Sequence, residues 1–123
     1  MDRKTELQSI STIMLGVRDV EASLAFYQDR LQLPVRMSSP DLAFLDGGNV
    51  TLGLSRGLAN ASASVAGAME VVFSVSSVRE AYNALCERGV KFLREPRQVT
   101  PNDWAATLED PDGHKISIFG PEN

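Results

Sequence analysis

Apolar and polar residues alternate near the start of the chain, as expected for a strand. One side carries Ile13, Leu15 and Val17, and the other carries Thr12, Met14 and Gly16. Apolar residues then recur at helical spacing between Val20 and Leu31, directly after Asp19, a residue type that often caps helix N-termini. Because proline cannot continue a helix, Leu33-Pro34 marks its end. The pattern therefore predicts a strand followed by one helix.

Three short strands are predicted after this helix. They cover residues 35–38, 42–45 and 50–55, with the turn sequence DGGN between the last two. The next segment, residues 56–67, reads RGLANASASVAG and is small and polar, without periodicity. This composition predicts a flexible linker.

The second half of the chain repeats this order of elements. Residues 69–75 alternate like a strand, and Ser77 and Glu80 form a capping box at the start of a helix that Gly89 ends. Three further strands are predicted at 90–93, 104–109 and 115–119, the last two joined by the turn sequence DPDG. The helix of this half also carries Cys86 on its apolar stripe, so we predict a buried, unreactive thiol.

Matching positions of the two halves lie 58 residues apart, as Val17 and Val75 or Leu24 and Tyr82 show. We therefore predict a single domain, residues 1–123, with two βαβββ modules at 10–55 and 68–119 and the flexible linker 56–67 between them. One helix can cover only one face of a four-stranded sheet. The other face must meet its counterpart, a partner chain or a ligand.

Composition and charge exclude several kinds of function. With one His and one Cys, the chain cannot assemble the Cys/His cluster of a zinc site. Its 12 Lys+Arg against 16 Asp+Glu oppose a nucleic-acid surface, and no apolar stretch is long enough to span a membrane. The first ten residues do not have the pattern of a signal peptide. We expect a cytoplasmic protein with no cofactor, no nucleic-acid partner and no membrane contact.

The paired modules resemble the vicinal oxygen chelate superfamily, which includes glyoxalase I, extradiol dioxygenases, fosfomycin-modifying enzymes and bleomycin-resistance proteins. The resemblance rests on a first strand followed by VRDVEASLAFYQDRLQL and on the closing segment LEDPDGHKISIFGPEN, of which DPDGH is the most specific part. It implies an α+β fold in which the modules curl a mixed sheet into a cup with the helices outside. It also implies a homodimer that completes its cups at a two-fold interface.

Metal-dependent members of this superfamily place four ligands in the cup, on the first and last strands of each module. Carried over by position, these slots fall on Thr12, Gly53, Glu70 and Ser117. Only Glu70 is a strong metal ligand, because two slots carry neutral hydroxyls and Gly53 has no side chain. We therefore expect no bound metal.

The same faces furnish the expected ligand site. Its residues are Thr12, Met14, Gly53, Glu70, Trp104, Ser117 and Phe119. Glu70 is either a strand-start carboxylate in contact with water or a partly buried acid that anchors a ligand cation or acts as a general base. Trp104 either stacks on a planar or cationic ligand or packs in the core. His114, after the DPDG turn, is expected at the surface.

These observations favour a metal-independent protein that binds a small organic molecule, cationic or aromatic, as in antibiotic sequestration by bleomycin-resistance proteins. The alternative is a lyase, isomerase or dioxygenase-type enzyme that uses Glu70 with or without a divalent metal. A third hypothesis is a sensory or structural domain whose cup is filled by its own side chains or by a partner chain.

Overall fold

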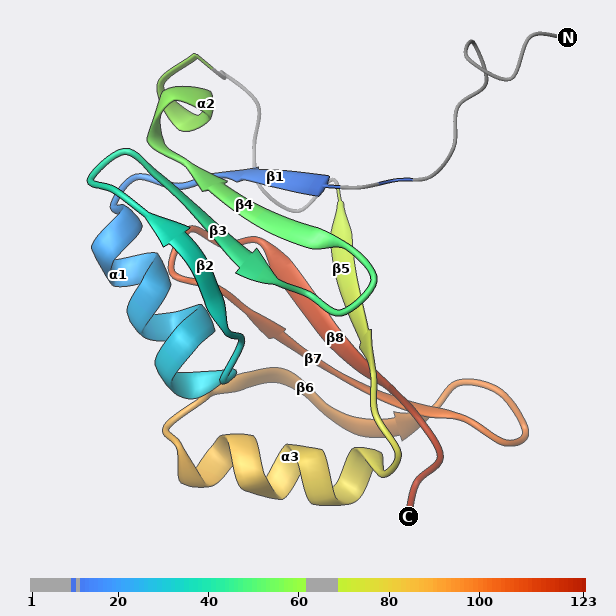
Figure 1. Ribbon diagram of the computed structural model, residues 1–123. Helices are drawn as coiled ribbons and strands as arrows, with labels where there is room; N and C mark the ends of the chain where they lie inside the picture. The colour runs from blue at the N-terminus through green and yellow to red at the C-terminus, as the bar shows by residue number, and fades with distance from the viewer. Residues whose placement is uncertain (1–9, 11, 62–68) are drawn as a thin grey trace, which may run out of the picture.

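The computed structural model describes residue 10 and residues 12–61 and 69–123 (Figure 1). Its elements are β1 (Thr12–Gly16), α1 (Val20–Leu24), the π-helix η2 (Ala25–Arg30), β2 (Val35–Ser38), β3 (Leu42–Asp46), β4 (Thr51–Ser55), α2 (Arg56–Ala61), β5 (Glu70–Ser74), α3 (Val78–Glu87), β6 (Phe92–Gln98), β7 (Trp104–Glu109) and β8 (Lys115–Gly120). The predicted order of elements is confirmed in both halves.

The strands form two four-stranded sheets of identical topology. The first sheet has the order β1-β4-β3-β2 and the second has the order β5-β8-β7-β6. In each, the first and last strands of the module pair in parallel, and the remaining pairs are antiparallel. The predicted α+β fold of duplicated units is therefore correct.

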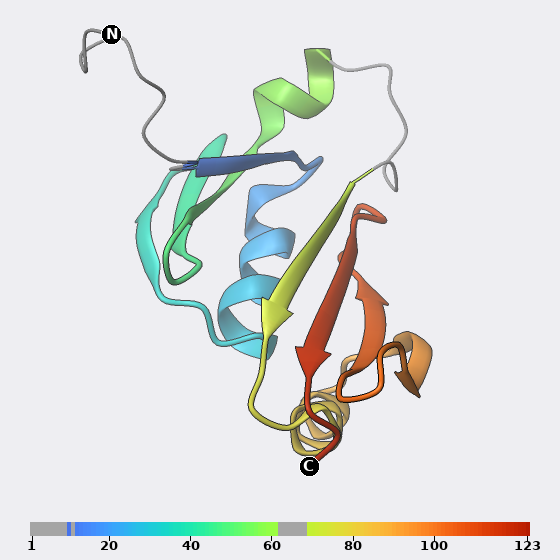
Figure 2. The same cartoon turned by 90° about the vertical axis from the view of Figure 1, so that its right-hand side faces the viewer.

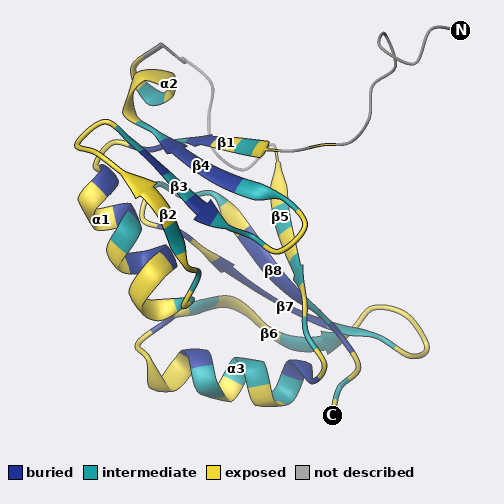
Figure 3. Ribbon diagram, in the orientation of Figure 1, coloured by how far each residue is buried: buried dark blue, intermediate teal, exposed yellow. Residues whose placement is uncertain are grey.

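Both sheets bury one face in a single shared core. The first sheet contributes Leu45 and Leu54, and the second contributes Leu108 and Ile118, each 4% exposed or less. Figure 3 shows this burial along the central strands β3, β4, β7 and β8. Figure 2 shows α1 between the two sheets, on the side of this shared core. Since the helix-bearing faces meet in one core, the opposite face of each sheet points away from it.

The first helix begins at the expected N-cap but changes its winding. The Asp19 carboxylate accepts a hydrogen bond from the Ala22 backbone N–H at 3.2 Å. From Ala25 the helix continues as a π-helix, in which the Leu31 N–H donates to the Phe26 carbonyl at 3.0 Å. Gln32 then adopts a φ of 62°, the left-handed turn that directs the chain into β2.

The helix of the second module ends as predicted at both termini. Ser77 Oγ accepts from the Glu80 backbone N–H at 3.1 Å, and Gly89 has a φ of 88°. In contrast, the prediction that Cys86 is buried is wrong, because this residue is exposed. Leu85 faces the core, and one further residue rotates the side chain by about 100° around the helix axis.

Two segments differ from the predicted boundaries. Part of the predicted linker, residues 56–61, is the helix α2, which begins where Ser55 Oγ accepts from the Leu58 N–H at 3.0 Å. The rest of the linker, residues 62–67, lies outside the described residues. The strand predicted at 90–93 runs instead from Phe92 to Gln98 and contains two register irregularities. Within the described ranges, no helix has the length and apolar character needed to cross a bilayer.

Candidate ligand-binding faces

The face of each sheet that carries no helix is its open face. On the first open face, the strand register aligns Met14, Gly53, Phe44 and Met37 in one row across all four strands. Met14 and Met37 are 39% and 40% exposed. A Cβ atom at position 53 would overlap the Met14 sulfur and lie 3.2 Å from Phe44 Cε1. Because Gly53 has no side chain, the Met14 thioether can lie over the middle of this apolar row.

A charged pair flanks the apolar row. Arg36 Nη1 donates to Thr51 Oγ1 at 2.8 Å, and its Nη2 lies 3.3 Å from the Asp46 carboxylate. Thr12 belongs to the same cross-strand row, opposite Thr51. Arg36 and Asp46 neutralise each other, so this end of the first open face presents no net charge.

The second open face carries a hydrogen-bonded chain across its four strands, formed by Arg97, Thr107, Ser117 and Glu70. Ser117 Oγ donates to Glu70 Oε2 at 2.8 Å and lies 2.8 Å from Thr107 Oγ1. Because the single Ser117 proton goes to Glu70, the Thr107 hydroxyl donates to Ser117. Arg97 Nη2 donates to Thr107 Oγ1 at 3.3 Å. The donors thus all run in one direction, from the guanidinium on β6 to the carboxylate on β5.

Burial differs along this polar chain. Ser117 and Thr107 are buried, whereas Glu70 is exposed at the start of β5. This exposure agrees with the alternative in which the Glu70 carboxylate contacts water. Two apolar residues border the chain: Val72 is 52% exposed, and Phe119 is half-buried.

Trp104 does not lie with the other expected ligand-binding residues. Alternation along β7 places it on the face opposite Ala105 and Thr107, and its ring packs against the shared core. The Arg79 guanidinium of α3 lies 5.8 Å from the ring centroid. The structure thus brings Thr12, Met14 and Gly53 together on one open face and Glu70, Ser117 and Phe119 on the other, with Trp104 on the helix side.

The four positions of the family's metal slots do not fit a divalent cation. Thr12 and Gly53 lie on the first sheet, and Glu70 and Ser117 on the second. Glu70 is the sole carboxylate among them, and the space over Gly53 holds the Met14 thioether. Within the described part of the chain, no three His, Cys, Asp or Glu residues gather as a metal site. A single carboxylate with neutral hydroxyls is a weak donor set for such an ion.

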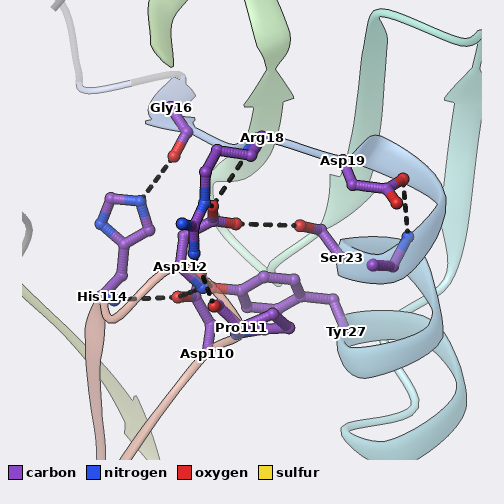
Figure 4. Close-up of polar contacts among 10 residues, drawn as sticks. Gly16, Arg18, Asp19, Ser23, Tyr27, Asp110, Pro111, Asp112 and His114 are labelled. Atoms are coloured by element: carbon purple, nitrogen blue, oxygen red, sulfur yellow. Dashed lines mark hydrogen bonds and ion pairs between the residues drawn. The ribbon is translucent and has the colours of Figure 1, made fainter.

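A polar cluster that the sequence did not predict joins the two modules (Figure 4). The Asp110 carboxylate is 4% exposed and accepts from Tyr27 Oη at 2.8 Å and from the backbone N–H groups of Asp112 and His114 at 2.9 and 2.8 Å. Burial and the negative charge of Asp110 raise the pKa of Tyr27 above its ordinary value. The DPDGH turn of module two is thereby fixed to the first helix.

Two more contacts complete this cluster. Arg18 Nε pairs with Asp112 Oδ1 at 2.9 Å. His114 Nε2 lies 2.7 Å from the Gly16 carbonyl oxygen, and because a carbonyl only accepts, this nitrogen carries the proton. His114, which was expected at the surface, is half-buried just before β8, and its ring contacts the end of β1. The sequence contained two hints of this cluster, the DPDGH segment and a Tyr on the apolar stripe of the first helix. Periodicity could not show that the two are in contact, because they lie far apart in the sequence.

A separate apolar cavity of about 220 Å³ lies on the helix side, between the modules. Its lining includes Leu31, Leu33, Phe73, Leu85 and Leu108, with Arg88 as the charged member. Arg88 Nη1 is engaged by the Arg30 carbonyl at 2.9 Å. The cavity shares no residue with the apolar row of the first open face or with the polar chain of the second.

A sequence model of the Glyoxalase/Bleomycin resistance protein/Dioxygenase superfamily matches residues 9–118. A glyoxalase/bleomycin resistance protein/dioxygenase from Nocardioides superposes with a TM-score of 0.79 at 25% identity, over 95% of this chain and 85% of its own. TnmS3, an antibiotic binding protein from Streptomyces sp. CB03234, gives 0.77 at 22% identity, over 94% and 97%. Lactoylglutathione lyase from Agrobacterium tumefaciens gives 0.77 at 17% identity, over 92% and 93%. No curated protein matches the chain.

Proposed function

Because the chain belongs to the glyoxalase/bleomycin resistance protein/dioxygenase superfamily, we propose that it binds a small organic molecule on its open faces without a metal ion. The observation that carries the proposal is the pair of open faces, one with an apolar row and the other with a polar chain. Organic ligand sites combine these two features, since apolar walls supply contact area and a few polar groups fix orientation.

Exposed apolar residues on these faces support this function. Met14, Met37 and Val72 are each about 40–50% exposed, although they lie in mid-strand positions. Methionine adapts its shape to planar ligands through its flexible thioether. Covering such residues with a ligand would stabilise the complex by about 25 cal/mol for each Å² of apolar surface removed from water.

Sequestration of an antibiotic is the form of binding that we propose. The structural similarity to TnmS3, an antibiotic binding protein, supports it at the level of the fold. The donor set at the four slot positions supports it independently, because Thr12, Gly53 and Ser117 give a divalent ion no carboxylate or imidazole. Binding and release would then be the whole activity.

We further propose that the ligand site forms in a homodimer. Within one chain each open face points away from the shared core, so the two faces cannot enclose one ligand. A two-fold axis would place the apolar face of one protomer against the polar face of its partner, and would do so twice. Each site would then have one apolar wall and one polar wall.

An acid–base enzyme is the second candidate, favoured by the placement of Glu70. Its exposed carboxylate accepts the Ser117 hydroxyl proton at 2.8 Å and lies at the end of a directed chain of donors. Such a carboxylate could accept a proton from a bound molecule. Glu70→Gln separates the candidates. In both cases the variant should keep its affinity for a neutral ligand, but only an enzyme would also lose turnover.

The proposal can be tested with 2-naphthamide, a neutral planar probe, by calorimetry and amide chemical-shift mapping. We expect metal-free, EDTA-dialysed protein to bind it with shifts on β1, β4, β7 and β8. Met14→Glu should weaken binding by about tenfold or more, because it buries a charge beneath the ring. Leu58→Glu, on exposed α2, is the matched control and should leave binding unchanged.

Two results would contradict this function. Binding that appears only after a divalent metal is added would refute metal independence. Shifts confined to Leu31, Leu85 and their neighbours would place the ligand in the helix-side cavity.

Sedimentation equilibrium tests the dimer, and a monomer at the ligand-binding concentration would refute the composite site.

A further inference from the structure

Arg97 on the second open face has guanidinium N–H groups that make no hydrogen bond to the described residues. Its guanidinium donates to Thr107 Oγ1 at 3.3 Å and to the Ala105 carbonyl at 3.4 Å, out of five N–H groups. Among the other described arginines, Arg18, Arg36, Arg56 and Arg79 each pair with a carboxylate, whereas Arg30, Arg88 and Arg94 do not. Arg97 makes no ion pair with any residue that the structure describes. The remaining N–H groups are thus available to an acceptor that is not part of the described chain.

The surroundings of Arg97 favour an anion as that acceptor. Burial lowers the pKa of Arg97, and the positive charge of Arg94 lowers it further. Glu70 acts in the opposite sense and has the smallest effect of the three on this pKa. Its carboxylate is bound to Ser117, at the other end of the polar chain. A guanidinium beside a second cation is stabilised most by an anion that binds directly to it.

The neighbouring side chains leave space for a planar group next to this anion. Along one cross-strand row the register places Arg97, Ala105, Phe119 and Ser74. Ala105 is small and buried, so it forms a low floor between the guanidinium and the Phe119 ring. Two strand spacings, about 10 Å, separate the backbones of Arg97 and Phe119. An aromatic ring that bears an acidic oxygen matches this length.

We propose that Arg97 is the anion-binding residue of the ligand site and that the ligand is an aromatic acid. The acidic oxygen accepts from the free Arg97 donors, and the ring lies over Ala105 toward Phe119. This inference rests on the proposed function and specifies its ligand class. Of the cationic or aromatic ligands expected from the sequence, it keeps the aromatic ring and replaces the cationic group with an anionic one.

Three probes that share a naphthyl ring test the ligand class: 2-naphthoate, 2-naphthamide and 2-naphthylmethylammonium. We expect 2-naphthoate to bind about tenfold or more tightly than the amide, and the ammonium to bind most weakly. Arg97→Gln should remove this preference, whereas Arg94→Gln, an identical change of charge on the same strand, should weaken 2-naphthoate binding by no more than about threefold. Arg97→Lys keeps the charge and should retain part of the preference, because lysine lacks the planar fork.

The outcomes separate the inference from the proposed function. Equal binding of all three probes, tightest binding of the ammonium, or equal losses in Arg97→Gln and Arg94→Gln would overturn the inference, while shifts on the open faces would still support a binding protein. Failure of all three probes to shift open-face amides at millimolar concentration would overturn both. Circular dichroism and the unfolding midpoint of each variant must match the parent protein, and Arg97→Lys supplies the test if Arg97→Gln does not fold.

Discussion

The two open faces occupy equivalent positions in equivalent sheets, yet they carry opposite chemistry. In the first sheet one cross-strand row reads Met14, Gly53, Phe44 and Met37, and the matching row of the second sheet reads Val72, Ser117, Thr107 and Arg94. The first residues of these rows, Met14 on β1 and Val72 on β5, are 58 residues apart in the sequence. The helix-bearing faces, in contrast, remain apolar in both modules.

The difference shows which positions the fold leaves free to vary. A residue on a helix-bearing face packs in the shared core, where only apolar side chains of suitable volume are tolerated. A residue on an open face meets solvent or a ligand, and a change there costs little stability. The duplicated unit could therefore keep its architecture while one open face remained apolar and the other acquired hydrogen-bonding groups.

The comparison holds only if the two modules fold as one unit. Of the variants considered, Asp110→Ala should destabilise this unit most. The change removes three hydrogen bonds to a buried carboxylate and leaves the Tyr27 hydroxyl without its acceptor. We expect the free energy of unfolding to fall by about 3 kcal/mol, measured in urea. Asp41→Ala, which removes an exposed carboxylate near Arg56, is the control and should cost less than about 0.5 kcal/mol. Equal stability of the two variants would show that the cluster does not hold the modules together.

A smaller effect is expected from Ser117→Ala, which interrupts the polar chain at its centre. Thr107 loses its acceptor and Glu70 loses its donor, but Glu70 is exposed and can bind water instead. We expect a loss of about 1–2 kcal/mol in the free energy of unfolding. The control is Ser74→Ala, an exposed serine on the same face, which should stay within about 0.5 kcal/mol of the parent. If Ser117→Ala were neutral, the polar chain would contribute nothing to stability.

The smallest effect should come from Gly53→Ser, which copies the polar residue of the second row into the first. The new Cβ displaces the flexible end of the Met14 side chain, which can move, so we expect a loss of less than about 1 kcal/mol. The Met14 methyl resonance should shift strongly. Gly57→Ser in α2, with no atom closer than 3.8 Å, is the control. A loss above about 2 kcal/mol would mean that the apolar row is as tightly packed as the core.

Periodicity and turn residues predicted most of the fold because these signals are local. Alternation along residues 12–17 and 69–75 assigned each strand's two faces, and Ser77 and Gly89 marked the ends of the second helix. The linker prediction missed α2, since its small residues have no apolar stripe. The predicted end of β6 was wrong because Arg94 and Pro96 interrupt the pattern of a strand.

The candidate site was predicted in part. Met14, Gly53, Glu70, Ser117 and Phe119 were placed on the correct faces by alternation. The same rule could have placed Trp104, because it shares its strand face with Ala106 and Leu108, which are both buried. Arg97 and the Tyr27–Asp110 contact could not be predicted, since each depends on strand register or on packing between residues far apart in the sequence.

The irregular register of β2 and β6 has a consequence for how the protein behaves when concentrated. These strands form one outer edge of each sheet, and each contains at least one position where the ladder slips. A bulged edge does not offer an unbroken row of free N–H and C=O groups to a neighbouring molecule. In β6, Pro96 also lacks an N–H, and three charged residues surround it. Both edges are therefore poor templates for the cross-molecule strand pairing that leads to aggregation.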